Sequence, residues 1–180
     1  MPRIPMVPEH PEDPQLAEMF AEVRQRWPQV PNLYRVLGNS PEMLRAWLDM
    51  AWPLRLNAST SRRTRELMIL HGARLTKTAF EWAHHVPLAL EAGVQQSEID
   101  RLYEGIIPDT VSEAERAALQ LAEEVTLGPE ASAECIEALR PHYSEAEIVE
   151  LVLTASFYVC VGRTLKSLDV PLEDRFPAPW

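Results

Sequence analysis

The chain has 180 residues, of which 46% are hydrophobic and 24% charged, a composition typical of one soluble domain with a buried core. Its formal net charge of −10 argues against nucleic acid or an anionic membrane as the main partner, because both select basic surfaces. No stretch reaches the ~20 apolar residues of a membrane span. The amino-terminal residues are interrupted by prolines and do not resemble a signal peptide. We therefore expect a cytoplasmic protein.

The only two cysteines are Cys135 and Cys160, and no Cys-x-x-Cys occurs. This spacing favours two buried, reduced side chains that behave as small hydrophobes. A disulfide between them is the alternative that the sequence leaves open.

An amino-terminal arm is expected over residues 1–14, which contain prolines at positions 2, 5, 8, 11 and 14. Each proline removes an amide donor and clashes with the preceding turn, so the arm cannot form a continuous helix. We expect it to lie extended over the body of the protein or over a neighbouring subunit. The remaining chain divides into a helical domain over residues 15–173 and an irregular tail over residues 174–180.

Helical signals follow the arm in series. Apolar residues recur at helical spacing from Leu16 to Val23, and Ser40 followed by Pro41 is typical of a helix start. Residues 65–75 are apolar almost all round, which predicts a central, buried helix.

The next helix is expected from about residue 78 to residue 92, where Gly93 is a natural stop. Pro87 lies inside this helix, so a kink is expected beside it.

Three serines, Ser97, Ser112 and Ser144, each precede an acidic residue by three positions, as helix N-caps do. The last helix, over residues 147–167, is too apolar for a surface helix. No stretch alternates with period two over the length of a strand. The fold class predicted is all-α.

The most informative pattern lies in residues 78–94, where Glu81 and His85 stand four positions apart. On a helix these positions share one face at about 6 Å, so both side chains can act on one small molecule. The same spacing also fits a surface ion pair worth only about 0.3–0.5 kcal/mol.

Several short motifs, in this order and spacing, resemble the carboxymuconolactone decarboxylase and alkylhydroperoxidase-D-like superfamily. They are Asn32-Leu33-Tyr34-Arg35, Arg63-Thr64-Arg65-Glu66-Leu67, Glu81-Trp82-Ala83-His84-His85-Val86-Pro87, and the closing segment over residues 157–173. Redox members carry Cys-x-x-Cys-x-x-x-His in the third motif. With His85 as the family histidine, the two cysteine positions fall on Thr78 and Glu81.

The resemblance implies a bundle of about seven to nine helices, assembled as trimers or hexamers, with pockets lined by the third motif and the closing helix. Better-known members decarboxylate an unsaturated γ-lactone without a cofactor or reduce peroxides with the cysteine pair. Because peroxide reduction needs a low-pKa thiolate and a resolving thiol, this chain fits the non-redox branch.

We therefore predict a cofactor-free decarboxylase, lyase or proton-transfer enzyme for a small carboxylated lactone or keto acid, with no catalytic metal. His85 is suited to proton transfer near neutral pH, and Glu81 could orient its imidazole or carry the proton itself. The alternatives are a non-catalytic ligand-binding or assembly member of the family and, less favoured, a thiol peroxidase.

Five further residues are candidates for substrate binding: Arg163, Tyr158, Trp82, Glu66 and His71. The planar guanidinium of Arg163 matches a carboxylate, although an ion pair across a subunit interface would also explain it. Trp82 could instead be a packing residue of the core, and His71 could be a hydrogen-bonded histidine in the core.

Glu66 lies twelve residues before Thr78, where redox members place a proton-relay glutamate, and it also fits a first-turn carboxylate stabilised by the helix dipole. His84 points away from His85 around the helix and suits a structural role or a subunit contact.

Overall fold

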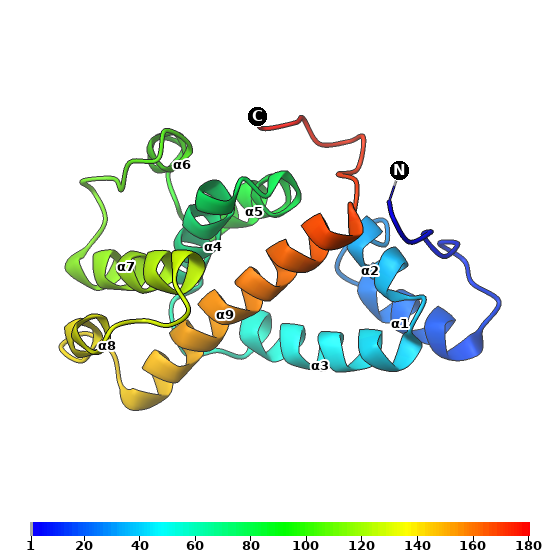
Figure 1. The fold of residues 1–180 in the computed structure, drawn as a ribbon, viewed down its shortest axis with the longest axis horizontal. Helices are drawn as coiled ribbons and strands as arrows, with labels where there is room; N and C mark the ends of the chain where they lie inside the picture. Colours follow the sequence, from blue (N-terminus) through cyan, green and yellow to red (C-terminus); the bar gives the residue numbers. More distant parts are fainter. Residues whose placement is uncertain (1) are drawn as a thin grey trace.

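The computed structural model describes residues 2–180, and within them every regular element is an α-helix, which confirms the predicted all-α class (Figure 1). The nine helices of this range fall within the expected number. They are α1 (Pro14–Arg24), α2 (Asn32–Leu37), α3 (Pro41–Leu56), α4 (Arg62–Thr76), α5 (Ala79–Glu91), α6 (Gln96–Tyr103), α7 (Glu113–Leu127), α8 (Ala133–Leu139) and α9 (Glu145–Leu168).

Helix α4 forms the centre of the bundle and packs against α5, α6, α7 and α9. Nine of its fifteen residues are buried, as its nearly uniform apolar sequence predicted. Helix α9 crosses the molecule diagonally and reaches from α7 and α8 at one end to α3 at the other (Figure 1). The space between α4, α5 and α9 therefore lies at the middle of the protein.

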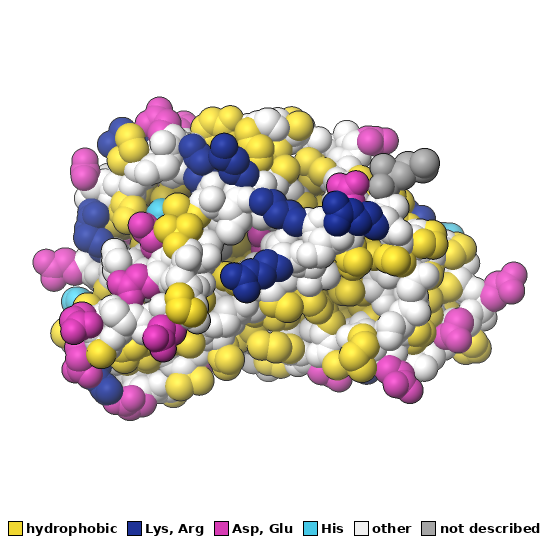
Figure 2. Space-filling view, viewed as in Figure 1, with side chains coloured by type: hydrophobic (Ala, Val, Ile, Leu, Met, Phe, Trp, Pro, Cys, Tyr) yellow, Lys and Arg dark blue, Asp and Glu magenta, His cyan; other side chains and the backbone are white. Residues whose placement is uncertain are grey.

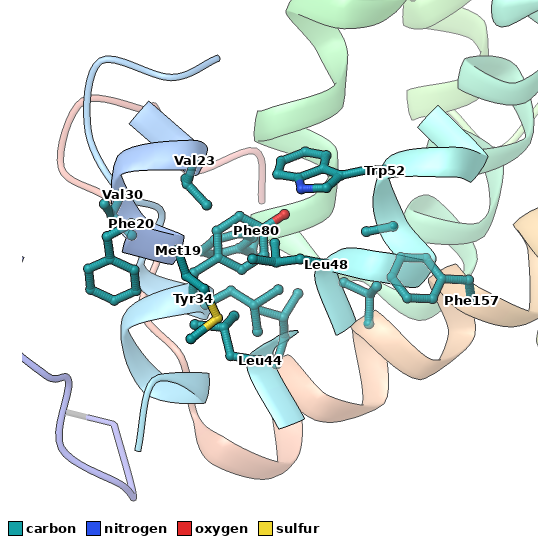
Figure 3. Close-up of a cluster of buried hydrophobic side chains, with 14 of the residues drawn as sticks. Met19, Phe20, Val23, Val30, Tyr34, Leu44, Leu48, Trp52, Phe80 and Phe157 are labelled. Atoms are coloured by element: carbon teal, nitrogen blue, oxygen red, sulfur yellow. The ribbon is translucent and has the colours of Figure 1, made fainter. Parts of the chain in front are cut away.

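Three hydrophobic clusters hold this arrangement. The first joins α1, α2 and α3 to Phe80 and to the second half of α9, and Figure 3 shows its aromatic side chains converging between these helices. The second packs α5 and α6 on α4, and the third packs α7 and α8 on α9. Helix α4 contributes to all three clusters and α9 to two of them, so these two helices join the parts of the core.

The amino-terminal arm lies over the body of its own chain. The amide of Val7 donates to the carbonyl of Arg35 at 3.0 Å, and the amide of Arg3 donates to the carbonyl of Leu168 at 2.8 Å. The side chain of Asn39 donates to the carbonyl of Pro5 at 2.7 Å. These bonds satisfy the extended backbone by pairing it with the ends of α2 and α9.

The N-cap predictions are confirmed for Ser112 and Ser144, whose hydroxyls accept from the amides of Glu115 and Glu147. The prediction for Ser97 is wrong, because α6 begins at Gln96, two residues earlier than expected, and Gln95 is its N-cap. Its third helical residue, Glu98, accepts from the Gln95 amide at 2.8 Å and so takes over the capping function. Gly93 follows α5 with φ +89°, a left-handed conformation that glycine adopts without strain.

The expectation that no segment reaches membrane-span length needs a correction. Helix α9 has 24 residues and a mean hydropathy of 1.5 in its most apolar window, so by length and composition alone it could cross a membrane. Half of that window is buried inside the protein, as in the core helix of a soluble bundle.

Replacing Ser144 with alanine should destabilise the protein by about 1 kcal/mol, because the first turn of α9 would lose the side-chain hydrogen bond that caps it. The measurement is urea unfolding followed by circular dichroism. Ser97→Ala is the matched control and should stay within about 0.5 kcal/mol of wild type, since the exposed Ser97 caps nothing. Equal losses in both variants would contradict the assignment.

Candidate active site

His85 on α5 forms a buried pair with Glu66 on α4. The Nδ1 of His85 lies 2.7 Å from Oε2 of Glu66, and both side chains are almost fully buried. The other oxygen of Glu66 is 2.5 Å from the guanidinium of Arg62, one turn earlier on α4. The residue that orients the imidazole is therefore Glu66 and not Glu81, and neither His85 nor Glu81 takes part in a surface ion pair.

The protonation states of this pair follow from burial and from mutual attraction. Burial lowers the pKa of His85, and the opposing attraction of Glu66 does not overcome it. Burial alone would raise the pKa of Glu66, but the facing His85 and Arg62 lower it on balance. A carboxylate thus accepts the Nδ1 proton of a neutral imidazole, which leaves Nε2 with a lone pair for accepting a proton.

Glu81 is a second buried carboxyl, 4% exposed, and its Oε1 has no hydrogen-bond partner among the described residues. Burial raises its pKa to about 8, against a hydrogen bond from Thr78 and the charges of Lys166 and Arg55. At neutral pH it is therefore mainly a carboxylic acid. A Cβ on Gly162 would lie 3.0 Å from Oε2 of Glu81 and 3.2 Å from Oγ1 of Thr78, so this glycine makes room for both side chains.

Arg55, at the end of α3, is a further candidate residue for the site that the sequence did not indicate. Its Nη1 donates to the hydroxyl of Tyr34 at 2.8 Å and its Nε to that of Tyr158 at 3.2 Å. The guanidinium also lies 5.7 Å from the ring centre of Trp27 and 5.8 Å from that of Trp52.

No carboxylate of the described chain pairs with Arg55, whose side-chain partners are the hydroxyls of Tyr34 and Tyr158. Burial raises the pKa of Tyr158 to about 12, so this phenol keeps its proton at physiological pH. A half-buried guanidinium without a carboxylate partner is suited to bind an anion. The only sequence signal was an arginine between Leu54 and Leu56, which resembles a cation placed against the helix dipole.

These groups line one internal chamber of about 40 Å³. Its polar wall combines α2, α3, α5 and α9 and consists of Tyr34, Arg55, Glu81, His84, His85 and Tyr158. The ring of Tyr158 meets the imidazole of His85 edge to face, with centroids 4.9 Å apart. The chamber holds no more than a few waters or one small functional group, since one water takes about 30 Å³ of liquid.

The structure brings Glu66, Glu81, His85 and Tyr158 together and places the other candidates elsewhere. Arg163 is exposed on α9 and lines a different cavity. Trp82 packs against the rings of Tyr103 and Trp180, which is the packing alternative for this residue. His71 is buried 3.0 Å from Glu123 and does not line the chamber.

His84 lines the chamber and is also tied to the carboxy-terminal tail. Its Nε2 lies 2.7 Å from Oε2 of Glu173, and its ring stacks on Phe80 with centroids 4.3 Å apart. The same carboxylate accepts from the amide of Asn32 at 2.7 Å. His84 therefore joins α5, α2 and the tail, in line with a structural role.

Neither cysteine belongs to this site. Cys135 is buried on α8, and burial next to Glu124 raises its thiol pKa to about 11, while Cys160 is exposed on α9. The two form no disulfide. Across residues 2–180 no group of three or more His, Cys, Asp or Glu side chains is placed to hold a metal ion.

Comparison with known proteins identifies the family. The sequence pattern of the carboxymuconolactone decarboxylase family matches residues 41–124, which include Arg55, Glu66, Glu81 and His85. The uncharacterized protein YdfG of Bacillus subtilis (strain 168) is 32% identical over 116 residues, which are 63% of this chain and 78% of YdfG. The chain belongs to the carboxymuconolactone decarboxylase family.

Solved structures show that this family member has the alkylhydroperoxidase-D-like fold. The alkylhydroperoxidase AhpD core of an uncharacterized peroxidase-related protein from Ralstonia eutropha JMP134 superposes with a TM-score of 0.84 at 18% identity, over 96% of this chain and 93% of that one. The debrominase Bmp8 superposes with a TM-score of 0.77 at 21% identity, over 92% and 88%. At these identities the likeness concerns the fold alone.

Substituting Glu66 with glutamine should lower the pKa of His85 further, because the neighbouring negative charge is what opposes the effect of burial. The measurement is the pH dependence of the imidazole resonances by NMR. The resonances of His71, whose partner is Glu123, serve as the internal control and should not move. An unchanged His85 titration would show that the pair is not electrostatically coupled.

In wild type the free energy of unfolding should decrease as pH rises, and substituting Glu81 with glutamine should abolish this decrease. Folded Glu81 keeps its proton up to about pH 8, whereas an ordinary glutamate loses it near 4.5, so the folded state binds more protons in between. The free energy of unfolding therefore falls as pH rises through this window, by up to roughly 4 kcal/mol.

The measurement is the free energy of unfolding in urea from pH 5 to pH 9 for wild type and variant. The difference between the two proteins cancels the contribution of His85, whose lowered pKa has the opposite effect on stability. Glu18→Gln, at an exposed position on α1, is the control and should keep the wild-type slope. A Glu81→Gln protein with the wild-type slope would mean that Glu81 ionises normally.

Proposed function

We propose that this protein is a cofactor-independent proton-transfer enzyme, a decarboxylase or a related lyase or isomerase, acting on a small carboxylated lactone or keto acid. One observation carries the proposal: a neutral histidine oriented by a buried carboxylate, an unneutralised arginine and a protonated carboxyl line the same small chamber. Together these are a base, an anion-binding group and an acid.

The reaction begins with the Nε2 lone pair of His85, which takes a proton from a carbon next to a carbonyl. The electron pair of the broken C–H bond moves onto the carbonyl oxygen, where the guanidinium of Arg55 stabilises the negative charge. Preorganised donors of this kind are typically worth about 10²–10³ in rate. Glu66 stabilises the imidazolium that forms, because it is held as a carboxylate by Arg62.

In a decarboxylation, carbon dioxide leaves and the electron pair of the broken C–C bond moves onto the carbonyl oxygen in the same way. The protonated Glu81 then supplies the proton that the dienolate carbon needs, and it regains one from solvent after product release. A carboxyl with a pKa of about 8 is a suitable donor at neutral pH.

A second candidate function, ligand binding without turnover, is favoured by the size of the chamber. A volume of about 40 Å³ accepts a carboxylate or a carbonyl group but not a whole lactone without movement of its walls. Thiol peroxidase chemistry has less support, because threonine and glutamate occupy the positions of the redox pair and the Cys135 thiol has a pKa of about 11.

The test is a panel of unsaturated γ-lactone carboxylates and β-keto acids, assayed for carbon dioxide release and, by NMR, for solvent deuterium exchange next to the carbonyl. We expect turnover in wild type, with a loss of kcat/KM of about 10²-fold or more in His85→Ala and in Arg55→Met. The matched controls are His142→Ala and Arg140→Met, at exposed positions remote from the chamber residues, and they should retain wild-type rates.

Full turnover in both chamber variants would refute the site. A wild-type protein that binds members of the panel, stabilises on binding them and releases no product would favour the ligand-binding function instead.

A further inference from the structure

A second and larger cavity of about 240 Å³ lies between α4, α7 and α9, on the other side of Glu81 from the chamber. Its walls are mostly apolar and include Met68, Ile69, Ala122, Ala155 and Val159. It shares only Glu81 and Tyr158 with the chamber, and neither His85 nor Arg55 lines it. The proton-transfer reaction proposed above leaves this space without a role.

The residues that line the cavity differ in exposure and so define its two ends. Glu81 and Tyr158 are 4% and 8% exposed and form the buried end, whereas Arg163 and Lys166 are exposed and form the open end. Small residues keep the space between them free. A Cβ on Gly72 would meet Oγ1 of Thr126 at 3.3 Å, and Gly162 has no room for one beside Glu81.

The buried end offers an unused polar group. Oε1 of Glu81 has no hydrogen-bond partner in the described chain, and leaving such an atom buried and unpaired is costly. A ligand oxygen that accepts the proton of the carboxylic acid would remove this cost.

The open end is basic in a protein with a formal net charge of −10. Neither Arg163 nor Lys166 forms an ion pair with any residue from 2 to 180. Figure 2 shows Lys and Arg side chains gathered in the middle of the face that α9 crosses, while Asp and Glu side chains lie mainly toward its ends. A local excess of positive charge on an acidic protein favours an anionic group at this mouth.

We propose that the cavity between α4, α7 and α9 binds a compact, mostly apolar carboxylic acid. Its carboxylate lies at Arg163 and Lys166, its body fills the apolar walls, and a carbonyl or ether oxygen at its far end accepts a hydrogen bond from Glu81. The site shares Glu81 and Tyr158 with the reaction chamber, but neither His85 nor Arg55 lines it, so probe binding and turnover can be tested separately.

The proposed hydrogen bond requires Glu81 to be protonated, and its surroundings favour that state. The charged and titratable groups that line the two spaces beside it are Arg163, Lys166 and Tyr158 from α9, Arg55 from α3, Tyr34 from α2, and His84 and His85 on its own helix. The parts of α4 and α7 that line the cavity bring no charged side chain. Burial outweighs the nearby cations and raises the pKa of Glu81 to about 8.

The probe is 4-acetylbenzoate, which carries a ketone and a carboxylate at opposite ends of a ring, with acetophenone and benzoate as the two truncated forms. Isothermal titration calorimetry at pH 6.5 should show binding of 4-acetylbenzoate, weaker by about tenfold for each truncation. Lys166→Met, a surface change that leaves the core intact, should reduce the affinity for 4-acetylbenzoate and leave that for acetophenone unchanged.

Ala155→Leu places a larger side chain in the cavity and should weaken binding of 4-acetylbenzoate by more than tenfold. Thermal unfolding verifies that it folds, and Val149→Leu, at an exposed position on the same helix, is the matched control. Arg55→Met should bind the probe as wild type does, since Arg55 does not line this cavity.

The pH dependence isolates the role of Glu81. Affinity for 4-acetylbenzoate should fall as pH rises through about 8 in wild type and stay constant in Glu81→Gln, whose amide donates at every pH. Glu81→Leu should bind weakly throughout. Absence of binding by wild type, unaltered affinity in Ala155→Leu, or loss of affinity in Arg55→Met would overturn the proposal.

Discussion

The structure depends on one buried interaction, the hydrogen bond between Glu66 on α4 and His85 on α5. The carboxylate of Glu66 does not tolerate burial alone, because an isolated carboxylate in the core costs several kcal/mol. Their pairing fixes the position of α5 on the central helix, and Arg62 completes it by neutralising the second oxygen of Glu66. The same contact that makes the core acceptable also gives the imidazole a defined tautomer, so stability and chemistry rest on the same atoms.

The lack of a Cys-x-x-Cys pair supports the proposed proton-transfer chemistry over electron transfer. Threonine and glutamate at positions 78 and 81 are packed beside Gly162, and the side chain of Glu81 is almost fully buried. Desolvation therefore favours the neutral form of Glu81. A buried thiol at this position would exchange electrons, whereas a buried carboxylic acid exchanges protons near neutral pH.

The sequence predicts the local features of this protein and not the distant pairings. Helical periodicity, the caps at Ser112 and Ser144 and the stop at Gly93 depend on neighbouring residues, and the structure confirms them. The sequence left open whether Glu66 is a proton relay or a first-turn carboxylate, because its partner His85 lies 19 residues away on another helix. Spacing alone favoured Glu81 as that partner, since i and i+4 are the only neighbours that a sequence displays.

Arg55 and Arg163 also show that the sequence does not predict which side chains the packing of helices encloses. Each is a cation on a largely apolar helix, so the sequence offers no means of ranking them. Only the packing of α2 and α3 encloses Arg55 beneath Trp27 and Trp52, while the packing of α9 leaves Arg163 exposed.

The position of Glu81 between two spaces couples them. An anion at Arg55 would add negative charge near the carboxyl and favour its protonated form, because like charges raise a carboxyl pKa. A ligand oxygen in the larger cavity favours the same form by accepting its proton. Since each occupant stabilises the state that the other prefers, linkage requires their binding to be mutually favourable. The coupling needs no movement of the helices, because the shared element is a single proton on a side chain that lines both cavities.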